Sequence, residues 1–100
     1  MVYQTIDDKG FTDHAENVAI DRDLIRMART GLGWSAKELA RRSRLGISTI
    51  SRAEGTGRGV SEGNLFLIQH AFEEAGVVFL EEDQASTGGG RGLRLPRRSQ

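Results

Sequence analysis

Residues 33–54 decide the fold, and their sequence is Gly33-Trp34-Ser35-Ala36-Lys37-Glu38-Leu39-Ala40-Arg41-Arg42-Ser43-Arg44-Leu45-Gly46-Ile47-Ser48-Thr49-Ile50-Ser51-Arg52-Ala53-Glu54. Ser35 and Glu38 have the S-x-x-E spacing of a capping box, in which each side chain satisfies a free backbone N–H at a helix start. Leu45-Gly46 interrupts the helical pattern, and Ile50 and Ala53, three residues apart, then give a second helix its inner face. The stretch therefore predicts two short helices joined by a tight turn.

The second of these helices exposes hydroxyl groups and one arginine, a combination that suits the major groove of DNA. We expect Arg52 to bind guanine through O6 and N7, Ile47 to contact a thymine methyl group, and Thr49 to contact the DNA backbone. The N-terminus of the first helix, with Lys37, is expected to lie against a phosphate, helped by the helix dipole. The predicted DNA-binding residues are Ser35, Lys37, Arg42, Ile47, Ser48, Thr49, Ser51, Arg52 and Arg58.

Residues 21 to 76 resemble the helix-turn-helix domain of the lambda-repressor/Cro-like (Xre-type) DNA-binding family. Trp34-Ser35 opens the second helix as in many members, and Ala40 stands where the family has a small residue. The apolar positions of the family are filled by Leu39, Leu45, Ile50 and Ala53. The resemblance also implies a salt bridge between Arg29 and Glu54 that ties the first helix of the domain to the recognition helix.

Three positions depart from the family pattern. Arg44 stands where the family usually has a glycine in a left-handed turn, so the backbone there is expected to be either strained or differently shaped. Gly46 replaces the usual Ser or Thr cap of the recognition helix, and Ala36 replaces a glutamine that often reaches the DNA backbone. These departures leave the helix pattern intact and affect the fine contacts to DNA.

Composition limits the chain to one small domain of 100 residues, and the absence of cysteine excludes disulfides and thiolate metal sites. The formal net charge is zero, but the charges are segregated. Residues 1–20 contain one basic and four acidic side chains, and residues 21–60 contain nine basic and four acidic ones. Residues 61–87 contain six acidic side chains and no basic one, whereas residues 88–100 contain four basic side chains and no acidic one. The positive block coincides with the predicted helix-turn-helix, as expected for a DNA-binding surface.

The expected fold class is mostly α, with a small four-helix lambda-repressor-like helix-turn-helix domain followed by a C-terminal β-hairpin. A poorly ordered arm is expected at 1–20 and the helix-turn-helix domain at 21–76, with helices over 22–30, 36–43, 47–54 and 62–75. After residue 76 the sequence pattern changes from helical to strand-like, so residues 77–96 are expected to form a hairpin and residues 97–100 a tail. Neither a catalytic motif nor a cofactor or metal site is found, since His14 and His70 stand apart and the loop 55–59 lacks the Lys-Ser/Thr of a P-loop.

The first strand of the predicted hairpin is apolar on both faces, and an isolated hairpin is marginally stable in water. A second copy of the chain is the simplest cover for the face that does not pack on the helices, and the alternative is an N-terminal arm folded back in the same chain. The predicted dimer interface consists of Val77, Val78, Phe79, Leu80, Leu93 and Leu95.

The sequence thus predicts a sequence-specific, double-stranded DNA-binding transcriptional regulator, a repressor that acts as a homodimer on a roughly palindromic operator. The recognition helices would lie about 34 Å apart, one turn of B-DNA. We expect a cytoplasmic, nucleoid-associated protein without membrane partners. Two alternatives stay open: an antitoxin that also neutralises a toxin partner, and a protein-interaction module that has lost DNA binding.

Overall fold

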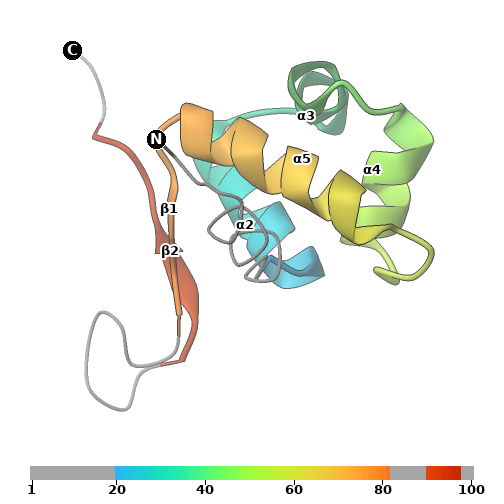
Figure 1. Cartoon of the computed structure of the whole chain (residues 1–100). Coiled ribbons are helices and arrows are strands. Elements are labelled where there is room, and N and C mark those ends of the chain that lie inside the picture. Colours follow the sequence, from blue (N-terminus) through green and yellow to red (C-terminus); the bar gives the residue numbers. More distant parts are fainter. Residues whose placement is uncertain (1–19, 82–89, 98–100) are drawn as a thin grey trace, which may run out of the picture.

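The computed structural model describes residues 20–81 and 90–97, and this part of the chain contains four helices and two strands. The elements are α2 (Arg22–Leu32), α3 (Ala36–Ser43), α4 (Ile47–Glu54), α5 (Glu62–Glu74), β1 (Val78–Leu80) and β2 (Gly92–Arg94). The predicted fold class, a mostly helical chain with four helices and then a C-terminal hairpin, is confirmed (Figure 1). Residues 1–19 of the predicted arm and 98–100 of the predicted tail lie outside the described residues.

Local capping explains where the helices begin. Asp21, Ser35 and Ser61 each accept a hydrogen bond from the backbone N–H three residues later, at 3.0 to 3.1 Å. These bonds satisfy N–H groups that have no partner inside the helix. The predicted bounds of α3 and α4 are confirmed, and α5 ends one residue before the predicted position, at Glu74.

The predicted end of α2 at Thr30 is wrong, because the helix continues to Leu32. Gly33, with φ of 75°, takes the left-handed conformation that ends the helix, whereas Gly31 stays helical. Gly31 has a packing role instead. A Cβ atom there would lie 2.7 Å from Cδ1 of Leu95, so the missing side chain lets the segment after β2 approach the helix.

The core lies between the helices and the inner face of the hairpin. Its buried apolar residues are Ile20, Leu24, Ile25, Ala28, Leu39, Ala40, Ile50, Ala53, Ile68, Ala71, Phe72 and Val77. Trp34, the residue before the cap of α3, stacks on Phe72 with ring centroids 5.7 Å apart. Ile20 was placed in the N-terminal arm, but it is buried, so the predicted boundary at 21 leaves out a residue of the core.

The two strands pair in antiparallel register, with Phe79 opposite Leu93. Both of these side chains pack against the core, and the Phe79 ring meets Phe72 edge-on with ring centroids 6.2 Å apart. Val77 was predicted to lie at a dimer interface, but only 2% of it is exposed. It precedes β1 and fills the core of its own chain, so it offers no surface to a partner.

The helices are short relative to the thickness of a bilayer. Within residues 20–81 and 90–97, no helix combines the length and the apolar character needed to cross a membrane.

Candidate nucleic-acid interface

One face of α4 is turned to solvent over its whole length. Ile47, Ser48, Ser51 and Arg52 are exposed, whereas Ile50 and Ala53 are buried. At 3.6 residues per turn, the four exposed positions form one continuous stripe opposite the two buried ones. Thr49 lies at the border of the stripe and is half-buried. The structure therefore brings together four of the nine residues predicted to contact DNA.

The polar side chains of this stripe are available to a partner. Among the described residues, the Ser48, Ser51 and Arg52 side chains form no hydrogen bond or ion pair with one another or with their neighbours. The Arg52 side chain lies close to Gly59, since a Cβ atom on Gly59 would be 3.9 Å from the Nε atom of Arg52. Three side chains with spare donors or acceptors on one helix face can read the edges of bases.

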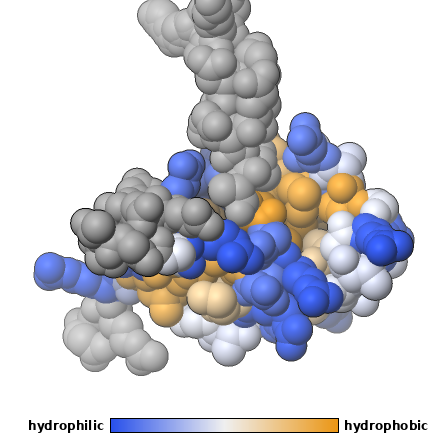
Figure 2. Space-filling view, turned by 90° about the horizontal axis from the view of Figure 1, so that it is seen from below, coloured by the Kyte–Doolittle hydropathy of each residue, from blue (hydrophilic) through white to orange (hydrophobic). Residues whose placement is uncertain are grey.

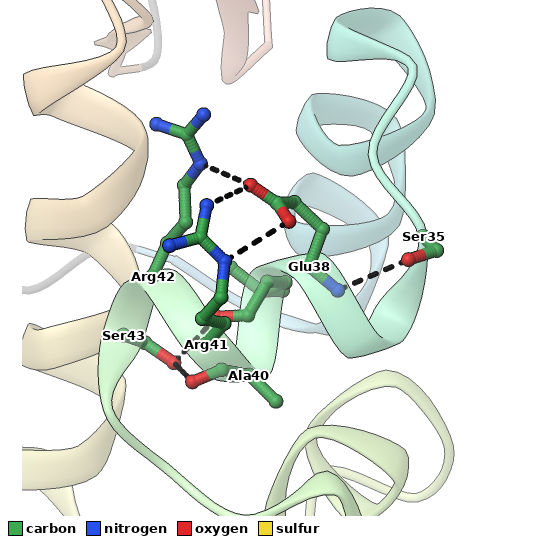
Figure 3. A network of polar contacts seen from close by, with 7 residues as sticks. Ser35, Glu38, Ala40, Arg41, Arg42 and Ser43 are labelled. Carbon is green, nitrogen blue, oxygen red and sulfur yellow. Dashed lines mark hydrogen bonds and ion pairs between the residues drawn. The ribbon is translucent and has the colours of Figure 1, made fainter.

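The start of α3 contributes Ser35 and Lys37 to the exposed surface. Ser35 caps the helix, with its Oγ accepting from the Glu38 N–H at 3.0 Å. The reciprocal half of the predicted capping box is not formed, because the Glu38 carboxylate binds Arg41 and Arg42 instead, at 2.6 and 2.7 Å (Figure 3). Hydrogen bonds from Arg41 and then Arg42 lower the pKa of Glu38 to about 2. Two guanidinium groups thus outcompete one backbone amide for this carboxylate.

Arg42, one of the residues predicted to bind DNA, contacts other side chains of its own chain. Its guanidinium lies 4.5 Å from the centroid of the Trp34 ring while its Nε donates to Glu38. Trp34 in turn stacks on Phe72 of α5. The side chain therefore has two partners inside the chain and covers the outer surface of an aromatic stack.

A partly buried ion pair between Arg29 and Glu54 links α2 to α4. Arg29 donates to both carboxylate oxygens of Glu54, at 2.6 and 3.0 Å, and to the Trp34 carbonyl at 3.0 Å. The Glu54 hydrogen bonds raise the pKa of Arg29 above its ordinary value. This is the salt bridge that the sequence resemblance implies. Because it is bidentate, it fixes the orientation of the helix end as well as its distance.

A second contact to the end of α4 was not anticipated. Arg22 donates through Nη1 to the Gly55 carbonyl at 2.9 Å. That carbonyl belongs to the residue that ends α4, where carbonyl groups lack partners inside the helix. The two arginines of α2 thus hold the C-terminus of α4 from one side.

The turn between α3 and α4 takes one of the two shapes that the sequence left open, the strained left-handed one. Arg44 adopts φ of 63° and ψ of 36°, the left-handed conformation. Leu45 N–H donates to the Ala40 carbonyl at 3.0 Å, which closes the end of α3. Gly46 then begins α4 without a side-chain cap. The arginine that replaces glycine therefore leaves the turn intact but carries a conformational cost.

Arg58 lies in the loop after α4, between two glycines with φ of 75°. Its backbone N–H donates to Thr56 Oγ1 at 3.0 Å, and its side chain is exposed. The loop is therefore an ordered turn that presents Arg58 to solvent.

A second long-range contact that the sequence did not predict joins Arg91 to Asp21. Arg91, just before β2, donates through Nε to Asp21 at 2.9 Å and pairs through Nη2 with the same carboxylate. Burial by itself raises the pKa of Asp21, but the Leu24 N–H and Arg91 outweigh it and lower the value. The two residues are 70 positions apart, and no local pattern relates them. The spacing of Glu38, Arg41 and Arg42, in contrast, is a local signal for the network on α3.

Comparison with known proteins adds no functional assignment. No protein-family model matches the chain, and no curated protein has significant sequence similarity to it.

Proposed function

We propose that this chain is a double-stranded DNA-binding protein whose α4 enters the major groove. The observation that carries the proposal is the exposed stripe on α4, formed by Ile47, Ser48, Ser51 and Arg52. Hydroxyl groups and a guanidinium bind base edges, and an exposed aliphatic group suits a thymine methyl. Within that class, the chain would be a transcriptional regulator of the lambda-repressor/Cro-like (Xre) type, a repressor acting as a homodimer at the nucleoid.

The charges of the helix faces favour α4 over the other helices. The exposed charged residues of α5 are the acidic Glu62, Glu73 and Glu74, and the helix contains no Lys or Arg, so its outer face would be repelled by phosphate. On α3, the guanidinium groups of Arg41 and Arg42 share the Glu38 carboxylate. The exposed face of α4 combines neutral hydrogen-bonding groups with an arginine, Arg52, that has no acidic partner among the described residues.

The surroundings of α4 supply candidates for phosphate contacts. Lys37, in the first turn of α3, and Arg58, in the loop after α4, are both exposed. A helix N-terminus adds partial positive charge beside Lys37. In this arrangement the residues that would read bases lie on α4, and the residues that would contact phosphate come before and after α4 in the sequence.

The test is a selection of bound sequences from random double-stranded DNA, compared between the wild type and three variants. Arg52→Ala should weaken binding to the selected site by about 1–3 kcal/mol and relax the preference at one base pair, since it removes a bidentate base contact. Lys37→Ala should weaken binding to all sequences alike and reduce the salt slope by about one unit. Arg94→Ala is the matched control, because it removes the same charge as Arg52→Ala from an exposed site on β2, at the other end of the molecule from α4 (Figure 1).

Two outcomes would contradict the proposal. An unchanged sequence preference in Arg52→Ala would show that α4 does not read bases. Absence of binding to any DNA at low salt, where phosphate contacts are strongest, would leave the chain as a protein-interaction module.

A further inference from the structure

A surface hollow of about 780 Å³ lies between α2 and the segment that leads into β2. Among its lining residues are Asp23, Arg26, Met27, Gly31 and Arg91. Met27 is 50% exposed, and Leu95, which lies against Gly31, is 40% exposed. Figure 2 views the molecule from below, the side where α2 lies in Figure 1, and shows hydrophobic surface interrupted by hydrophilic side chains. This hollow is thus amphipathic, with an apolar side chain exposed in its wall.

One edge of the strand beside the hollow is unpaired in the part of the chain that the structure describes. The sheet has the order β1-β2, so among the described residues β2 pairs only with β1. The β1 side of the hairpin faces α5, since Phe79 packs on Phe72, and β2 is the strand that contacts α2. The unpaired N–H and C=O groups of an edge strand are a template for another strand.

We propose that a second copy of this chain adds its own β2 to this edge, antiparallel across a two-fold axis. The resulting four-stranded sheet would have the order β1-β2-β2-β1, with the two β2 strands at its centre. Leu93 and Leu95 lie two residues apart and therefore share a face of the strand, the face that packs toward the core and Gly31. In the dimer, Leu93 would stay packed on the core of its own copy, and the exposed part of the Leu95 side chain of each copy would extend over Met27 of the other. This inference specifies the interface of the homodimer in the proposed function.

The charges of the hollow favour a second copy as the occupant. Across a two-fold axis a patch meets itself, so it must be self-complementary. Asp23 and Arg26 provide both signs next to Met27, and Arg91 is already neutralised by Asp21. Pairing at the edge would also remove the exposed strand edge and enlarge a two-stranded sheet that is marginal alone.

The alternative arrangement, in which the outer faces of two hairpins stack, is disfavoured by the register. Val78 is exposed on that face, but its cross-strand partner is Arg94, which is also exposed. Among the described residues, that face carries no acidic side chain, so stacking would bury the Arg94 guanidinium without a charged partner. In the edge-paired dimer, both Val78 and Arg94 stay in solvent.

Three single substitutions by lysine separate these arrangements, each at a residue that is 41 to 50% exposed. Met27→Lys places a charge in the proposed interface, Val78→Lys places one on the outer sheet face, and Leu67→Lys on α5 is the matched control. Sedimentation at micromolar concentration should give the wild type, Val78→Lys and Leu67→Lys as particles of twice the 11.0 kDa chain mass. Met27→Lys should dissociate with a dimer dissociation constant raised about tenfold or more, because a charge is buried against leucines. Circular dichroism should show that all four chains keep the helical fold.

The proposal would be overturned by a wild type that is a monomer, by a Met27→Lys variant that stays dimeric, or by a Val78→Lys variant that dissociates. These outcomes are independent of DNA binding. A monomer that still selects a DNA sequence overturns the interface alone, whereas a dimer with the predicted response to Met27→Lys that binds no DNA overturns the proposed function alone.

Discussion

Replacing Arg44 by glycine should stabilise this protein, although the substitution removes a whole side chain. Arg44 ends α3 with φ of 63°, the left-handed region that L-residues with a Cβ atom disfavour. It is the only residue other than glycine with positive φ in the part of the chain that the structure describes. The native turn therefore carries a conformational cost that a glycine would not have.

The magnitude follows from two opposing effects. Relief of the left-handed conformation is worth about 1–2 kcal/mol. A glycine also makes the unfolded chain more flexible, which lowers the free energy of unfolding by about 0.5–1 kcal/mol. The net gain in the free energy of unfolding thus lies between about 0 and 1.5 kcal/mol, and the midpoints of the two ranges give about 0.75 kcal/mol. At about 4–8 °C per kcal/mol for a domain of this size, this midpoint corresponds to a rise in melting temperature of about 3–6 °C.

Thermal unfolding followed by circular dichroism measures the effect, with Arg44→Ala as the control. Arg44 lies beside Arg41 and Arg42 around a shallow hollow, so removing its charge alone could change stability. Arg44→Ala removes the charge but keeps the Cβ atom, and the stability difference between the glycine and alanine variants isolates the turn. A glycine variant that melts no higher than the alanine variant would refute the argument from backbone conformation.

Two further predictions concern the ion pairs. Glu54→Gln should lower the free energy of unfolding by about 2 kcal/mol, because it leaves the partly buried Arg29 guanidinium without its charged acceptor, whereas the exposed Glu73→Gln should have a much smaller effect in the same urea titration. The pKa of Glu38 is about 2 in the folded chain against an ordinary 4.5, so ionised Glu38 stabilises the fold above pH 4.5, and this contribution should disappear as the pH falls toward 2. Urea unfolding of wild type and Glu38→Gln should therefore converge in that window, and a stability difference that stays constant across it would contradict the assignment.

The helix pattern was accessible from the sequence because it depends on local chemistry. Ser35 and Ser61 cap their helices through bonds to the third following residue, so the signal and its effect lie within one turn. The turn at Arg44 was only partly predictable, because the family resemblance left open whether this residue is left-handed or the turn has another shape. Glu38 shows where local reasoning fails, because its carboxylate had two sets of local partners and the pattern did not decide between them.

In the candidate site too, some features follow from local sequence and others depend on tertiary packing. The exposed stripe on α4 follows from helical periodicity, since Ile50 and Ala53 fix which face is buried. Arg42 could not be placed in this way, because its position over Trp34 depends on how α5 supports that ring. An exposed arginine on a helix can turn to solvent, to an acid or to an aromatic ring, and only the neighbouring elements select one of these.

The sequence by itself determined the order of four helices and a hairpin, the turn between α3 and α4, and the face of α4 that meets solvent. These features rest on capping, glycine placement and periodicity, which act over a few residues. Only the tertiary structure decided that Val77 belongs to the core, that Leu95 lies on Gly31, and that Arg91 binds Asp21. Each of these contacts joins segments that are distant in the chain, so it depends on the packing of the whole domain and not on the residues near it in sequence.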